Sequence, residues 1–197
     1  MIEKIKEWDT QLFLLLNSFH TPLMDTAMYW ITDKWFWFPF YGLIIFFLIR
    51  RYNWQGVWII VTVVIAITLA DQIASALFKP YFLRKRPCYE EAITQVVHVV
   101  RGCGGQYGFV SSHASTTFAF AMFMWLLLRN ALPYISYLFY WAFLVSYSRI
   151  YVGVHYPLDL FFGAMVGIAC ALLMFMVYKL LKIDKIKVKS KEQIRIN

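Results

Sequence analysis

Long apolar runs alternate with short polar breaks along most of the chain, a pattern typical of membrane-spanning helices. One run is rich in aromatic residues and closes on Arg50-Arg51, and the next is longer and is interrupted only by Asp71-Gln72 and Ser75. About 20 apolar residues cross a hydrocarbon core roughly 30 Å thick, so the shorter runs need a thinner membrane or recessed ends. The pattern predicts five spans, at residues 35–49, 54–78, 113–128, 133–147 and 157–181.

The first 34 residues follow a different pattern. Apolar residues recur at steps of three and four from position 2 to position 19, while Glu3 and Lys6 lie off this stripe. Thr21 followed by Pro22, with Asp25 in the first turn, predicts the start of a second short helix. We therefore expect two amphipathic helices in the membrane interface, with a sixth, tilted crossing as the alternative.

Composition and charge exclude two broad classes. The chain of 197 residues is 61% hydrophobic and only 15% charged, which excludes an ordinary soluble globule. Its net charge of +8 does not indicate nucleic-acid binding, because seven of the 19 basic residues lie after the last apolar run, between Lys179 and Arg195. Such a tail indicates the cytoplasmic side of a membrane. We expect an all-α integral membrane protein, divided into amphipathic helices (1–34), a transmembrane bundle of five to six helices (35–182) and a basic cytoplasmic tail (183–197).

This orientation gathers the unusual polar residues on one face. If the tail and the basic turns at Arg50-Arg51 and Arg129 are cytoplasmic, the opposite face receives three separated segments. They are KPYFLRKRP (79–87), SSH (111–113) and SRIYVGVHYPLD (148–159).

These three segments supply the groups that handle a phosphate. Arginine presents a planar fork of donors to phosphate oxygens, and histidine serves as nucleophile, acid or base near neutral pH. Asp159 follows His155 by four residues, with Pro157 near the first helical position, so its carboxylate lies within reach of the imidazole. A carboxylate placed there fixes the tautomer and leaves the other ring nitrogen free to attack. The cations are Lys79, Arg86 and Arg149, and the second imidazole is His113.

The three segments resemble the signature of the type-2 phosphatidic acid phosphatase superfamily. The resemblance covers about residues 50–180 and consists of K-x6-R-P, S-x-H and S-R-x5-H-x3-D in that order. The middle motif departs from the family pattern, because VSSH (110–113) stands where Pro-Ser-Gly-His is usual, so Ser112 replaces a glycine. The other two motifs match fully, at Lys79, Arg86 and Pro87 and at Ser148, Arg149, His155 and Asp159.

The resemblance implies a lipid phosphatase that needs no metal or other cofactor. By this resemblance His155 attacks phosphorus, Asp159 orients it, and His113 protonates the leaving oxygen and then activates water. The phosphoryl oxygens are then held by Lys79, Arg86, Arg149, Ser111 and Ser112. The implied setting is the inner membrane of a bacterium, with the site facing the periplasm or exterior and the C-terminus in the cytoplasm.

The lipid itself remains open at this point. We expect undecaprenyl diphosphate first, because small members of this family often recycle that carrier, with phosphatidylglycerophosphate, phosphatidate and lipid A phosphates as alternatives. A vanadium-type haloperoxidase shares these motifs but is soluble. A non-catalytic anion transporter would use the charges without needing a histidine–aspartate pair.

A few residues lie outside the motifs. Cys88 and Cys103 flank the polar loop on the outer face, and we expect a disulfide between them. Arg84 and Lys85 are expected to be solvated or to contact lipid headgroups. Asp71 lies within an apolar span, and we expect a buried hydrogen bond between helices there.

Overall fold

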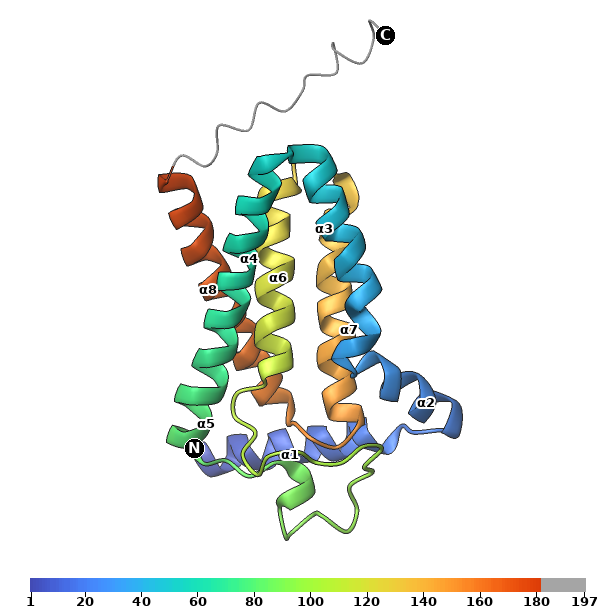
Figure 1. Ribbon diagram of the computed structural model, residues 1–197. Helices are drawn as coiled ribbons and strands as arrows, with labels where there is room; N and C mark the ends of the chain where they lie inside the picture. The colour runs from blue at the N-terminus through green and yellow to red at the C-terminus, as the bar shows by residue number, and fades with distance from the viewer. Residues whose placement is uncertain (182–197) are drawn as a thin grey trace, which may run out of the picture.

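The part of the chain that the structure describes is almost entirely helical. The computed structural model describes residues 1–181, so the expected basic tail at 183–197 lies outside it (Figure 1). Extended pairing within residues 1–181 is limited to one isolated bridge between Lys85 and Tyr107, which confirms the all-α fold class. The helices are α1 (Ile2–Ser18), α2 (Pro22–Ile31), η1 (Lys34–Trp37), α3 (Phe38–Tyr52), α4 (Trp54–Gln72), η2 (Ile73–Phe78), α5 (Lys79–Phe82), η3 (Pro87–Tyr89), α6 (Ser112–Leu128), η4 (Pro133–Ser136), α7 (Tyr137–Tyr151) and α8 (Pro157–Leu180).

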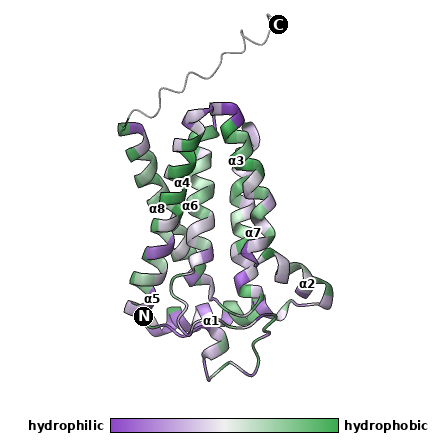
Figure 2. Cartoon of the chain, viewed as in Figure 1, coloured by the Kyte–Doolittle hydropathy of each residue, from purple (hydrophilic) through white to green (hydrophobic). Residues whose placement is uncertain are grey.

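The long helices form an upright bundle with α1 lying across one end. In Figure 1, α3, α4, α6, α7 and α8 run along one another, and α1 crosses beneath them. Figure 2 shows apolar residues along the shafts of these helices and polar residues gathered at the two ends. Many large apolar side chains on the shafts are exposed, including Leu43, Phe46 and Phe143. An apolar exterior between polar ends is the surface of a membrane protein.

Two helices are long and apolar enough to cross a membrane unaided. They are Trp54–Phe82, of 29 residues, and Pro157–Leu180, of 24 residues, and the pair Pro22–Ile31 with Lys34–Tyr52 would make a third if its 66° bend is part of one span. The expected count of five to six is not reached by this measure. The reason is length, because α6 has 17 residues and α7 has 15, or roughly 23–26 Å at 1.5 Å per residue.

Two predicted helix starts agree with the structure. The Thr21 hydroxyl accepts a hydrogen bond from the Met24 amide at 3.3 Å, and Pro22 occupies the first position of α2. Pro157 begins α8, where the Asp159 carboxylate accepts the Tyr156 amide at 3.0 Å. A carboxylate at the third helical position often caps the start of a helix. Here this hydrogen bond fixes the Asp159 side chain beside Tyr156.

Two predicted spans end too early. The helix that begins at Trp54 continues through a π-helical turn, η2, into α5, and stops only where Leu83 adopts a left-handed φ of 48°. Helix α7 continues to Tyr151 rather than ending at 147. In both cases the apolar pattern stops before the helix does, because the last turn carries polar side chains. Lys79 and Arg149 therefore project from helix ends rather than from loops.

Small residues bring α6 and α8 close together. A Cβ added to Gly163 of α8 would lie 2.7 Å from the Ser111 carbonyl oxygen, a distance that no side chain tolerates. The Ser111 amide also donates to the Asp159 carbonyl oxygen at 3.0 Å. Close backbone contact between small residues is a common way to pack membrane helices. It places the start of α6, with His113, against the start of α8.

Candidate active site

The segment before α8 holds a buried histidine–aspartate pair. His155 Nδ1 lies 3.3 Å from Asp159 Oδ2, and the two side chains are 2% and 0% exposed. The ionised carboxylate accepts the Nδ1 proton, which leaves Nε2 of the ring as the unprotonated nitrogen. The predicted contact between His155 and Asp159 is thus present in the structure.

Burial and nearby cations keep the His155 ring neutral. Burial, followed by the positive charges of Arg149, Arg86, Lys79 and Arg84, lowers the pKa of His155 well below its usual range. A lowered histidine pKa means that the uncharged, nucleophilic ring is the form present at pH 7. Cations from two of the three motif segments, 79–87 and 148–159, therefore act on this ring.

Arg84 is part of this arrangement, and the expectation that it is solvated is wrong. Its guanidinium donates to Asp159 Oδ1 at 3.0 Å and to Asp9 Oδ2 at 2.6 Å, and it stacks 4.0 Å over the Tyr156 ring. Asp9, from α1, is itself buried and also accepts the Leu158 amide at 2.9 Å. One arginine therefore ties the amphipathic helix to the aspartate that contacts His155. Lys85, by contrast, forms an exposed pair with Glu91.

Arg149 and Lys79 each donate a hydrogen bond to a hydroxyl group. Arg149 donates to the Thr32 hydroxyl at 2.5 Å. Lys79 donates to the Ser112 hydroxyl at 3.0 Å. Ser112, which stands where the family has glycine, thus contacts a motif lysine directly. Thr32 has no motif around it, so only the fold reveals its position.

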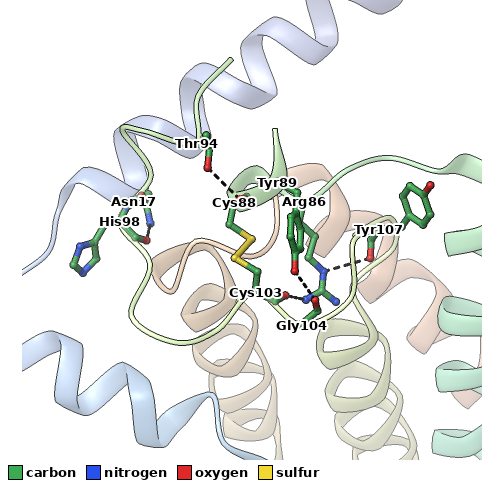
Figure 3. The surroundings of a disulfide bond; sticks show 9 residues. All are labelled: Asn17, Arg86, Cys88, Tyr89, Thr94, His98, Cys103, Gly104 and Tyr107. Carbon is green, nitrogen blue, oxygen red and sulfur yellow. Dashed lines mark hydrogen bonds between the residues drawn. A yellow bond between two sulfur atoms is a disulfide. The ribbon is translucent and has the colours of Figure 1, made fainter. Parts of the chain in front are cut away.

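Arg86 is held by a disulfide-linked loop. Cys88 and Cys103 form a disulfide, and the carbonyl oxygens of Cys103 and Tyr107 accept hydrogen bonds from the Arg86 guanidinium (Figure 3). The Tyr89 hydroxyl donates to the Gly104 carbonyl at 2.9 Å across the same loop. The cross-link therefore fastens the two sides of the loop around Arg86. A structural disulfide is typical of the oxidising side of a membrane.

Two polar atoms at the site lack partners among residues 1–181. The Ser111 hydroxyl and the Arg149 Nε are buried and without a hydrogen bond there. Buried polar groups are normally satisfied, so these atoms are suited to bind the oxygens of a ligand. Gly108 lets the loop backbone pack closely against the His155–Asp159 pair, because a Cβ there would crowd Asp159 Oδ2 at 3.2 Å and His155 Nδ1 at 3.4 Å.

An open cavity of about 290 Å³ leads toward these groups. Arg86, Arg149 and His113 line it, together with Thr32 and the loop residues 101–104. A cavity with three arginines and a histidine on its wall can bind an anion of phosphate size. The cavity is not lined by Lys79, Ser111, His155 or Asp159.

Three relatives of the chain are named as phosphatases of lipid substrates. The chain is 38% identical over 170 residues to a lipid A 4'-phosphatase of Bacteroides thetaiotaomicron, which covers 85% of the chain and 75% of the relative. It is 35% identical over 179 residues to a lipid A 4'-phosphatase of Porphyromonas gingivalis, covering 90% and 75%. A more distant relative, 26% identical over 172 residues and covering 81% and 73%, is an undecaprenyl-diphosphatase of Sulfolobus acidocaldarius.

The fold and a family model agree with these relatives. The crystal structure of Aquifex aeolicus LpxE superposes with a TM-score of 0.66 at 27% identity, covering 85% of this chain and 94% of that one. The model of the PAP2 superfamily matches residues 56–182, which include all three motifs. The chain therefore belongs to the PAP2 superfamily, in agreement with the signature in its sequence.

Proposed function

We propose that this membrane lipid phosphatase removes the 4'-phosphate of lipid A through a phosphohistidine at His155. The observation that carries the chemistry is the buried His155–Asp159 pair surrounded by cations. The choice of lipid follows the two relatives named lipid A 4'-phosphatases. It replaces undecaprenyl diphosphate, the leading expectation from sequence, with one of its alternatives.

In the first step of this proposal, His155 Nε2 attacks the phosphorus of the lipid phosphate. The N–P bond forms as the bond from phosphorus to the sugar oxygen breaks. His113, held in its protonated form by the negative charge of the bound phosphate, gives its proton to that oxygen. Charge on the phosphoryl oxygens is met by Lys79, Arg86 and Arg149, together with Ser111 and Ser112. These side chains supply the positive charge and the hydrogen bonds that stabilise the phosphoryl oxygens, so the proposed reaction requires no metal or other cofactor.

In the second step, water releases the phosphate. His113, now neutral, takes a proton from the water as its oxygen attacks phosphorus, and the N–P bond breaks. Inorganic phosphate leaves, and His155 returns to its starting form. The use of one histidine first as acid and then as base follows from microscopic reversibility.

Within this mechanism Arg84 and Asp9 are positioning residues. Arg84 holds Asp159 Oδ1 while His155 and the Tyr156 amide use Oδ2, so the carboxylate is fixed at both oxygens. Asp9 anchors the other end of the guanidinium and caps the Leu158 amide. The position of α1 at the membrane surface would thereby affect the orientation of Asp159 and His155.

We also propose that five helices cross the membrane, with the active site on the outer face of a bacterial inner membrane. Helix α8, which begins two residues after His155, starts at the end of the bundle that α1 covers, whereas the last turn of α3, with Arg50 and Arg51, lies at the other end (Figure 1). Basic turns favour the cytoplasmic side, and the Cys88–Cys103 disulfide favours an oxidising compartment for the site. On this assignment the C-terminus is cytoplasmic and α1 lies in the outer interface.

The second candidate substrate is undecaprenyl diphosphate, which the more distant relative named for it favours. A role as a non-catalytic anion transporter has no comparable support, because membership of the family indicates a phosphatase.

A lipid panel tests the choice of substrate. Purified protein in detergent with a chelator would be given lipid A, undecaprenyl diphosphate, phosphatidylglycerophosphate and phosphatidate at equal surface concentration. We expect kcat/KM to be at least about tenfold higher for lipid A, a difference of about 1.4 kcal/mol in transition-state binding, with loss of the 4'-phosphate seen by mass spectrometry. A preference for undecaprenyl diphosphate would overturn the assignment, whereas dependence on added metal would contradict the mechanism.

A further inference from the structure

A second cavity adjoins the site on the side of the bundle interior. It has a volume of about 330 Å³ and shares Thr32, Lys34 and His113 with the outer cavity. His113 is the proposed proton donor to the leaving oxygen, so the group attached to that oxygen must lie on its side of the phosphate. The second cavity is therefore placed to receive the leaving group.

The wall of this second cavity combines a carboxylate with aromatic rings. Asp71 of α4 lines it, and so do Trp37 and Trp141, whose rings meet edge to face with centroids 5.5 Å apart. The expected hydrogen bond from Asp71 to another helix is wrong, because no residue of the described chain donates to its carboxylate. Trp141 Nε1 is also buried without an acceptor among residues 1–181.

These groups match a sugar better than a prenyl or glyceride group. A carboxylate accepts hydrogen bonds from hydroxyl and amide groups, an indole N–H donates one, and flat aromatic rings cover the apolar faces of a sugar ring. A prenyl phosphate leaving group has no donor and carries a charge that a carboxylate repels. The diacylglycerol unit of phosphatidate offers only ester oxygens, which cannot donate to Asp71, and the bridging glycerol of phosphatidylglycerophosphate offers a single hydroxyl and no amide.

Apolar cavities continue from this polar one. A cavity of about 340 Å³ between α3, α4 and α6 shares Tyr41 and Thr116 with it, and one of about 560 Å³ between α3, α6 and α7 shares Trp141. Both are lined mainly by aliphatic and aromatic side chains, which suit acyl chains. A headgroup in the polar cavity would thus have room for attached acyl chains beside it.

We propose that the second cavity binds the acylated hexosamine that carries the phosphate, and that Asp71 accepts a hydrogen bond from its amide or hydroxyl groups. The inference rests on the proposed function and deepens it by naming a specificity-determining residue. The rival role for Asp71 is as a counter-charge to Lys79, about two turns further along the same continuous helix. That role would affect every substrate equally.

Asp71→Asn separates the two roles, because it removes the charge and keeps the shape. We expect kcat/KM for lipid A to fall about 10–100-fold, as for loss of a hydrogen bond to a charged group, and that for p-nitrophenyl phosphate to stay within about twofold. Ser75→Ala is the matched control, since the Ser75 hydroxyl donates to the Asp71 carbonyl oxygen at 2.6 Å without lining the cavity. It should leave both substrates unchanged.

A product analogue makes the test independent of turnover on lipid A. Inhibition of p-nitrophenyl phosphate hydrolysis by an N-acylglucosamine amphiphile should weaken at least about tenfold in Asp71→Asn and not in Ser75→Ala. If the wild type ignores lipid A but this inhibition depends on Asp71, the proposed substrate fails and the hexosamine site stands. Inhibition that is absent, or equal in all three proteins, overturns the site.

Asp71→Glu guards against a folding defect in the asparagine variant. It keeps the negative charge near Lys79 and moves the carboxylate by about one methylene. The hexosamine site predicts weaker inhibition by the analogue and unchanged hydrolysis of p-nitrophenyl phosphate. Equal loss with lipid A and p-nitrophenyl phosphate in both Asp71 variants would assign Asp71 to Lys79 and overturn the proposal.

Discussion

Replacing His155 by alanine should lower phosphate release by about 10⁴–10⁶-fold, the loss typical of removing a catalytic nucleophile. The ring is 2% exposed, and its Nδ1 faces Asp159, so Nε2 is the nitrogen left to attack phosphorus. Only the weak attack of water on a phosphate held by the arginines would remain. The measurement is inorganic phosphate released from lipid A by detergent-purified protein.

The controls for His155→Ala address folding and general histidine effects. His155→Gln keeps a polar side chain of similar volume and should be as inactive, which removes the cavity that alanine leaves as an explanation. His20→Ala changes an exposed histidine that stacks on His98 at 3.8 Å, on the same end of the molecule, and should keep at least about half of the activity. Residual activity above about 1% in a folded His155→Ala protein would contradict the assigned nucleophile.

Asp159→Asn should lower kcat by about 10³–10⁴-fold, as for an orienting aspartate in other nucleophile–base pairs. The amide keeps the volume of the side chain but loses the charge that holds the Nδ1 proton, so the ring can turn its protonated nitrogen toward phosphorus. The effect should fall on kcat rather than on KM, because Asp159 is not proposed to touch the substrate. Steady-state kinetics with lipid A measure both quantities.

Arg84→Lys should have the same kind of effect as Asp159→Asn, but a smaller one. A lysine keeps the positive charge but cannot donate to Asp9 and Asp159 at once, as the arginine fork does. We expect kcat to fall by about tenfold to a hundredfold with KM little changed, which lies between the wild type and Asp159→Asn. A rise in KM alone would instead place Arg84 in the phosphate site.

The sequence predicted the helical class and the grouping of three motifs at one end of the bundle. Both follow from local patterns, because apolar runs define helices and the alternation of polar ends defines the two faces. The contacts of His155 with Asp159 and of Thr21 with Met24 were also predictable, since each lies within one helical turn. The predicted helix ends at 78 and 147 were too early, because hydropathy shows where apolar residues stop and not where the helical hydrogen bonds of the backbone stop.

The rest depends on contacts between distant parts of the chain. Arg84 and Asp9 are 75 residues apart, and Thr32 and Arg149 are 117 apart, so no spacing rule links either pair. Asp71 looked like a packing residue because the sequence does not show that α4 borders a cavity at that depth. A buried acid in an apolar span was the only available signal, and it pointed to function without naming one.

The most direct test of the central claim is a search for phosphate bound covalently to His155. His113→Ala, mixed with p-nitrophenyl phosphate, should form the intermediate, since nitrophenolate leaves without a proton, and should break it down slowly because the base is missing. After rapid quenching at high pH, mass spectrometry should find one acid-labile phosphate on His155, with a burst of nitrophenolate equal to the enzyme concentration. Turnover by the wild type with neither burst nor phosphohistidine in this variant would mean that water attacks phosphorus directly and would contradict the account.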